Sequence, residues 1–163
     1  MNIVNLKQCA EFLPKLAEWH QQEWAYLNPG QSLQDRIEKM QDYLNDDFIP
    51  STFVAIENDV LGSAAIIECD LDTRPDLSPW LASVYVAPEY RKQGVGAALV
   101  QHAMQQACDQ GYTKLFLYTP SQEKFYQRLG WKIIERVDFH DAVVTIMSIS
   151  LKTVDKSNES RAV

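Results

Sequence analysis

The sequence predicts one domain of the α/β (α+β) class, with about seven strands and about four helices. Short apolar runs typical of strands alternate with longer segments whose apolar residues recur at helical spacing. The 163-residue chain is long enough for one substantial core and too short for two. It contains no internal repeat and no linker. We therefore assign residues 1–151 to one domain and expect the polar segment 152–163 to be a disordered tail.

The first two predicted elements are a strand at residues 2–7 and a helix at residues 8–26. The helix is expected to end at Asn28-Pro29-Gly30, since proline and glycine interrupt helices. Large side chains recur along it every three to five residues, at Phe12, Leu16, Trp19 and Trp24.

A second helix is predicted to begin after Ser32, a favourable N-cap, with Asp35 at the capping-box position. Its expected apolar face consists of Leu33, Ile37, Met40 and Leu44. Residues 51–57 and 60–69 follow as two strands, which we expect to pair as a hairpin across Asn58-Asp59.

A buried central strand is predicted at residues 80–86, and Pro88 ends it because proline lacks the N–H that a ladder requires. A third helix is expected to open at about Gln93 and to be capped by Gly111. Helical spacing relates its inward-facing residues, which are Val95, Leu99, His102, Ala103, Gln106 and Ala107.

The last part of the chain is predicted to contain three strands and one short helix. A strand at residues 114–118 precedes the helix at 121–129, which Gly130 ends. Residues 131–139 and 142–151 then form an antiparallel pair.

Between the central strand and the third helix lies the segment Arg91-Lys92-Gln93-Gly94-Val95-Gly96, which we call the glycine loop. A helix opening at Gln93 leaves unpaired backbone N–H groups at residues 93–96. These donors and the positive end of the helix dipole suit a phosphate oxygen, and glycine lets a ligand approach the backbone. Arg91 and Lys92 add mobile positive charge. The residues therefore predict a pyrophosphate site, and an ordinary glycine-containing helix start is the alternative.

Two common phosphate loops do not fit this segment. A Walker loop requires Gly-x4-Gly-Lys-Ser/Thr, which the sequence lacks. A dinucleotide fingerprint requires Gly-x-Gly-x-x-Gly/Ala, but Leu99 occupies the last position. The segment resembles the Arg/Gln-x-x-Gly-x-Gly/Ala loop of the GNAT N-acetyltransferases at every defined position. The stretch Phe125-Tyr126-x-x-Leu129-Gly130-Trp131 is similar to a second signature of that family.

The resemblance is strongest over residues 80–131 and implies a mixed, mostly antiparallel sheet of about seven strands flanked by about four helices. It also implies acetyl-CoA as the acetyl donor. The central strand and the strand after it would splay apart and hold the pantetheine arm, bonded by backbone groups of Tyr85, Val86 and Ala87. The resemblance places the other cofactor contacts at Arg91, Lys92, Gln93, Gly94, Val95, Gly96, Ala97 and Ala98, with a weaker indication for Thr119.

Tyr126 matches the tyrosine that protonates the departing thiolate in many members of the family. A phenol with an ordinary pKa near 10 is protonated at neutral pH, as this role requires. Phe125 and Leu129 are expected to face the core and to hold the ring. The alternative is a structural tyrosine that packs against the cofactor. Backbone N–H groups of the central strand would polarise the thioester carbonyl.

The general base and the acceptor site are less defined. Glu68, Asp70 and Asp72 follow the first hairpin and are candidate bases, although an acidic loop is usually a solvated surface. Proton relay through water, without a dedicated base, is the other reading. The aromatic residues Trp19, Trp24 and Tyr26 lie where relatives form an acceptor lid, so they form either a wall for an amine or helix-against-sheet packing.

Composition narrows the partners. The net charge of −7 argues against nucleic acid as the main partner and mildly favours a cationic substrate. No apolar run approaches the roughly 20 residues of a membrane span, and no secretory signal is evident, so we expect a cytoplasmic protein. We expect the three cysteines to be reduced, buried thiols, namely Cys9, Cys69 and Cys108. The histidines do not lie at metal-ligand spacing from these cysteines. The sequence leaves open whether the protein forms a homodimer.

These features favour an enzyme that acetylates a primary amine of a small molecule or a peptide by direct attack. A protein N-terminal or lysine acetyltransferase is one alternative, and a non-catalytic acyl-CoA sensor or interaction module is another. A nucleotide-binding regulator is disfavoured, because both nucleotide loop patterns fail.

Overall fold

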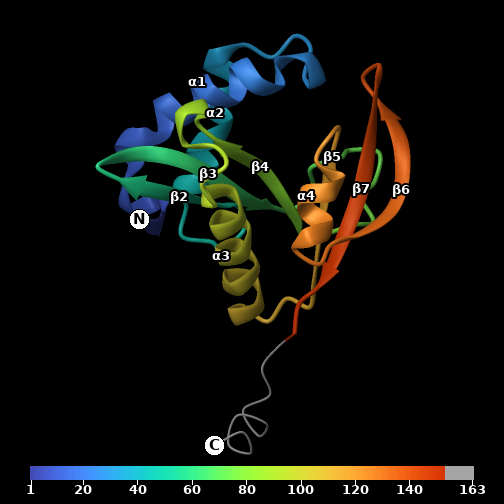
Figure 1. The fold of residues 1–163 in the computed structure, drawn as a ribbon. Helices are drawn as coiled ribbons and strands as arrows, with labels where there is room; N and C mark the ends of the chain where they lie inside the picture. The colour runs from blue at the N-terminus through green and yellow to red at the C-terminus, as the bar shows by residue number, and fades with distance from the viewer. Residues whose placement is uncertain (153–163) are drawn as a thin grey trace, which may run out of the picture.

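The computed structural model describes residues 1–152 and contains a seven-stranded sheet with four α-helices (Figure 1). The strands are β1 (Asn2–Asn5), β2 (Ser51–Glu57), β3 (Asp59–Ile67), β4 (Trp80–Val86), β5 (Lys114–Thr119), β6 (Lys132–Phe139) and β7 (Ala142–Ser150). The helices are α1 (Leu13–Trp24), α2 (Leu33–Met40), α3 (Val95–Asp109) and α4 (Glu123–Arg128). The predicted class and element order are confirmed. Apart from Lys152, the predicted tail lies outside the described residues.

The strands follow the order β1-β2-β3-β4-β5-β7-β6 across the sheet. All neighbours pair antiparallel except β4 and β5, which are parallel. The sheet is therefore mixed and mostly antiparallel, as expected. Both predicted hairpins form, with Asn58 in the left-handed region at the tip of the first one.

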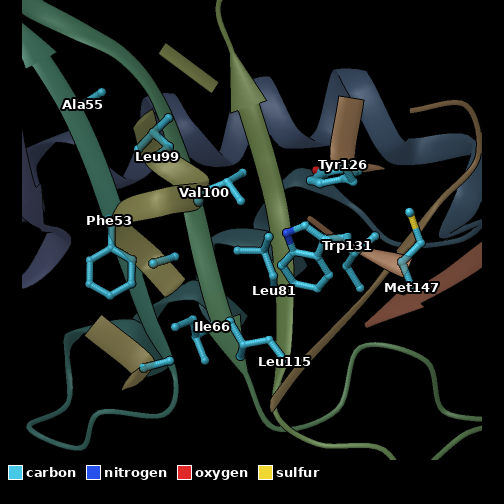
Figure 2. Packing of buried hydrophobic residues seen from close by; sticks show 14 of the residues in the cluster. Phe53, Ala55, Ile66, Leu81, Leu99, Val100, Leu115, Tyr126, Trp131 and Met147 are labelled. Carbon is cyan, nitrogen blue, oxygen red and sulfur yellow. The ribbon is translucent and has the colours of Figure 1, made fainter. Parts of the chain in front are cut away.

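Helices cover both faces of the sheet, so successive side chains along a strand point alternately into two cores. On one face α3 and α4 pack against strand residues such as Phe53 and Leu81 (Figure 2). On the other face α1 and α2 enclose a separate cluster that includes Val54. The neighbours Phe53 and Val54 thus belong to different cores, as the two-residue period of a strand requires.

Three helix starts differ from the predictions, and for α4 the difference is small, since it begins at Glu123 rather than residue 121. α1 begins at Leu13 rather than residue 8, because Pro14 has no N–H to donate and is tolerated only in a first turn. The preceding residues form short 3-10 turns. α3 begins at Val95 rather than at about Gln93, since Gly94 is its N-cap in the left-handed region, at φ 85°.

Side-chain predictions around α2 and the cysteines were partly wrong. Ser32 and Asp35 form the expected capping box. However, Leu33 is 40% exposed and does not belong to the apolar face. Of the cysteines only Cys9 is buried, whereas Cys69 is exposed at the end of β3. Within residues 1–152, no helix combines the length and apolar character that a membrane crossing needs.

Gly62 is required where β3 meets β4. A Cβ atom there would lie 2.3 Å from the Tyr85 carbonyl oxygen, which belongs to backbone held by the strand ladder. We expect Gly62→Ala to lower the free energy of unfolding by about 1–3 kcal/mol, as overpacking does. Chemical denaturation would measure the loss. Gly96→Ala is the matched control, because the nearest atom to its added Cβ lies 3.5 Å away. Equal stability of the two variants would contradict the clash.

Candidate active site

The sheet opens between β4 and β5. Their only paired residues are Trp80 and Phe116, and beyond this point the strands diverge (Figure 1). The predicted splaying is therefore present. A β-bulge accompanies it: the register against β3 shifts between Ser63 and Ala65, and Ser83 adopts a φ of 51°. Because a bulge bends its strand, it helps to turn β4 away from β5.

A cleft of about 740 Å³ occupies this opening. Its walls come from β4, β5, the ends of α1 and α2, the segment after β3, and α4. From β4 it receives Leu81, Ala82, Ser83 and Val84, and from β5 Leu117, Tyr118 and Thr119. Tyr126 lines the same space. Segments far apart in the sequence, from Glu23 to Tyr126, thus meet in one cleft.

The three β4 residues predicted to bond a pantetheine arm differ in orientation. The Ala87 N–H donates to the Leu61 carbonyl of β3 at 2.9 Å. Backbone groups alternate sides along a strand, so Tyr85 also faces β3 and Val86 faces the open edge. The Val86 carbonyl accepts a hydrogen bond of 2.7 Å from Arg91 Nε. Only Val86 therefore presents its backbone to the opening.

Arg91 was expected to supply mobile charge, but here its side chain has several contacts. Besides bonding Val86, its guanidinium lies 5.5 Å from the centre of the Tyr85 ring and 3.8 Å from a Glu23 oxygen. Lys92 is exposed and has a φ of 63°. Of the two cations, Arg91 is thus tied to β4 and α1, and Lys92 projects from the loop.

The glycine loop directs backbone N–H groups outward at the start of α3. The Ala98 N–H donates to the Gly94 carbonyl at 3.0 Å and closes the first helical turn. Ala98 is therefore not a free donor, and the unpaired N–H groups belong to Gly94, Val95, Gly96 and Ala97. The Val95 side chain is buried in the core. A Cβ at Gly96 would lie 3.5 Å from Phe125 and 3.6 Å from Val86, which places the loop beside α4 and the edge of β4.

Tyr126 is buried at the foot of the cleft. Its ring is packed edge-on between Phe125, at 4.9 Å between centroids, and Trp131, at 6.1 Å. Phe125 and Leu129 pack against the core as expected. Burial raises the Tyr126 pKa above its ordinary value near 10, so the phenol keeps its proton at neutral pH.

Thr119 lies in the cleft and is also part of the fold. Its Oγ1 accepts hydrogen bonds from the backbone N–H groups of Gln122, at 3.0 Å, and Ser121, at 3.4 Å. The side chain thus satisfies donors at the start of α4. This bonding fixes α4, and with it Tyr126, relative to β5.

The three candidate bases are separated by the structure. Glu68 and Asp70 line the cleft, whereas Asp72 is exposed and outside its lining. Burial raises the Asp70 pKa to about 7, although the positive charges of Lys39 and Arg36 act to lower it. Asp70 therefore combines location with a pKa suited to proton transfer near neutral pH.

The aromatic residues near α1 divide between the two alternatives, a wall for the acceptor amine and packing of the helix against the sheet. Trp24 and Tyr26 line the cleft, and Tyr26 is 59% exposed. Trp19 instead packs on the α1 core and lies 5.3 Å from the Tyr85 ring. Sequence reasoning missed His20, which is buried beside these rings with Nε2 3.0 Å from Ser63 Oγ. Burial lowers the His20 pKa to about 3, so it is a neutral packing residue.

Arg36 was also missed. It lies on α2, lines the cleft and is partly buried. The charges that act on it include Asp70, and the phenols of Tyr43 and Tyr118 are also nearby. Sequence pattern did not indicate Arg36, because an arginine on a polar helix usually faces solvent. Within residues 1–152, no group of three or more His, Cys, Asp or Glu side chains is arranged to hold a metal ion.

Comparison with known proteins places these features in context. A sequence model described as "Acetyltransferase (GNAT) domain" matches residues 50–133. The match contains the glycine loop, the diverging strands β4 and β5, and Tyr126, but not α1 or α2.

Two curated proteins share part of this sequence. N-alpha-acetyltransferase 30 of Schizosaccharomyces pombe is 30% identical over 84 residues, which are 49% of this chain and 56% of that protein. N-acetyltransferase 8 of Homo sapiens is 34% identical over 80 residues, which are 47% of this chain and 35% of that protein. The chain thus spans about half the length of the first relative and about a third of the second.

The fold also matches solved structures. The crystal structure of an aminoglycoside 6'-N-acetyltransferase complexed with coenzyme A gives a TM-score of 0.73, covering 93% of this chain and 98% of that chain. The two sequences are 17% identical, so the comparison establishes the shared fold alone.

Proposed function

The chain belongs to the GNAT acetyltransferase family, and we propose that it transfers an acetyl group from acetyl-CoA to a primary amine of a small molecule or peptide. One observation carries this proposal: the β4–β5 opening, the start of α3 and Tyr126 are adjacent. The opening suits an extended amide chain, the helix start suits a diphosphate, and the tyrosine supplies a proton between them.

The donor half of the site fits coenzyme A. Unpaired N–H groups from Gly94 to Ala97 suit phosphate oxygens, and the exposed Lys92 adds a positive charge nearby. The Val86 backbone offers an N–H and a carbonyl to an amide-bearing chain, as a sheet edge does to an added strand. The Val86 carbonyl already accepts one hydrogen bond from Arg91 and has a second lone pair for a donor of the ligand. Bound acetyl-CoA would supply the acetyl group as a thioester.

In this proposal, side chains of the protein donate and accept the protons of the reaction. Edge N–H groups of β4 polarise a carbonyl placed in the cleft. Tyr126 donates a proton to the departing thiolate, which its raised pKa permits throughout the neutral range. Asp70 accepts a proton from the acceptor amine, directly or through water. These roles are those of a direct attack of the amine on the thioester, in which no covalent intermediate forms on the protein.

The role of Asp70 predicts a pH dependence. A base is active when deprotonated, so with a pKa of about 7 the rate rises as pH increases through 7 and then levels. Asp70→Asn is expected to lower kcat by about 100-fold and to remove this rise. Initial rates from pH 5.5 to 9 with one acceptor would measure both effects. Asp72→Asn, outside the cleft, is the control and should retain the wild-type profile. Matching profiles for all three proteins would exclude Asp70 as the base.

Ligand binding and turnover test the proposal as a whole. Acetyl-CoA and CoA should raise the melting temperature and titrate by calorimetry, whereas ATP should bind weakly. Thiol release with a panel of small amines and peptides should then identify an acceptor. Stabilisation by ATP alone would overturn the assignment. Tight CoA binding without turnover of any acceptor would favour the non-catalytic sensor instead.

A further inference from the structure

Among the residues that the structure describes, the Arg36 guanidinium forms no ion pair. Its Nη2 donates to the neutral Gln31 Oε1 at 3.1 Å, while its Nε is buried and has no hydrogen-bond partner. Because burial removes part of its hydration, the pKa of the Arg36 guanidinium lies below its ordinary value. A half-buried guanidinium normally forms charge-assisted bonds, so this one has unused donor capacity.

Asp70 carries the opposite charge once it is deprotonated, and its pKa is about 7. It lines the cleft with Arg36, and each influences the pKa of the other, yet they form no ion pair. Glu68 adds a second carboxylate to the segment after β3, and Lys39 adds a second cation to α2. The cleft therefore carries cations from α2 and carboxylates from the end of β3, and these groups form no ion pair with one another. Two further carboxylates line it, Asp42 after α2 and Glu23, which lies 3.8 Å from Arg91.

We infer that the acceptor is a zwitterion, a small amino acid whose amine lies at Asp70 and whose carboxylate is bound by Arg36. This inference rests on the proposed function and names its substrate class. The planar guanidinium matches a carboxylate with two parallel N–H donors, a geometry that lysine does not offer. Gln31 takes up one N–H of Nη2, so the outer edge of the guanidinium, formed by Nη1 and the second N–H of Nη2, is left for the ligand.

The charge of the whole chain favours a different acceptor. The net charge of −7 by itself suggests a polycation. A polyamine, however, would place a positive group near Arg36, where no carboxylate is bonded to it. The arrangement of charges inside the cleft therefore decides for an acceptor that carries both signs.

Matched acceptors test this inference. CoA-saturated protein would be titrated by calorimetry with α-, β- and ω-amino acids and with the amines that lack the carboxylate. Acetyl transfer to the same compounds would be followed by thiol release. We expect at least one amino acid to exceed its decarboxylated amine by about tenfold or more in affinity and in kcat/KM. Equal values throughout the panel would overturn the inference.

Variants then assign the preference to Arg36. Arg36→Met should remove the preference, so that the ratio of kcat/KM for the amino acid to kcat/KM for its matched amine falls to about one. Because loss of the Arg36 charge also raises the Asp70 pKa, this ratio is compared between the variant and the wild type at one pH and is the readout in place of either rate alone. Arg36→Lys should restore little of this preference, because the ammonium group of lysine does not offer two parallel N–H donors to a carboxylate. An equal loss for both compounds would contradict carboxylate recognition. If amines are turned over without discrimination, this inference fails and the proposed function stands. If CoA does not bind, the proposed function fails first.

Discussion

Tyr126→Phe is expected to lower kcat for acetyl transfer by about 100-fold or more, within the range that loss of a general acid produces. Affinity for CoA should change little, because the phenylalanine ring can occupy the same place between Phe125 and Trp131. Thiol release at saturating acetyl-CoA would measure kcat, and calorimetry with CoA would measure binding. The separation of the two effects identifies a proton donor rather than a packing residue.

The pH profile adds an independent check. An acid must be protonated to act, and burial raises the Tyr126 pKa above 10, so wild-type activity should not decline up to about pH 10 on account of this group. Tyr112→Phe is a suitable control, since Tyr112 stacks on Phe48 and lies outside the cleft. It should retain full activity. A Tyr126→Phe variant with kcat within twofold of wild type would show that water protonates the thiolate.

Local patterns predicted the elements because those patterns were strong. The boundaries of β4 agree with the prediction at both ends, since an apolar run stops at a proline. The capping box of α2 also formed as expected. Pro14 shows the limit of periodicity alone: apolar spacing continued upstream of it, but the helix did not. A breaker inside a periodic segment decides the boundary more reliably than the period.

The geometry of the opening was not readable from local sequence. Ser83 adopts a positive φ, yet serine is not typical of that region, so no residue type announced the bulge. The divergence of β4 from β5 depends on register against β3, which is a contact between distant segments. Only the family resemblance indicated the splaying, and it indicated neither the bulge nor the loss of Ala87 as a donor.

The acceptor side was hidden for a related reason. Asp70 belongs to a sequence segment that reads as a solvated acidic loop, and Arg36 belongs to a helix that reads as a polar surface. Both readings assume that polar residues face water. The fold brings α2 against the end of β3, and this long-range contact turns two surface charges into groups of a cleft. Burial is a tertiary property that composition and spacing do not encode.

Gly96→Glu is expected to weaken CoA binding by at least about 100-fold. Gly96 is the second residue of α3, and its N–H belongs to the unpaired first turn. A carboxylate there would lie against the diphosphate. Two like charges 4 Å apart repel by about 4 kcal/mol at an effective dielectric constant of 20, which exceeds the 100-fold threshold. Calorimetry with CoA would measure the loss.

The same substitution should not harm the fold, which makes the loss of binding specific. Nothing lies closer than 3.5 Å to a Cβ at this position. A carboxylate in the first turn of a helix is favourable by about 0.3–1 kcal/mol, so the melting temperature without ligand should be unchanged or higher. Gly96→Gln has nearly the same size without the charge and should retain more of the affinity. Undiminished CoA binding by Gly96→Glu would mean that the diphosphate lies elsewhere, and the donor half of the proposed site would then be wrong.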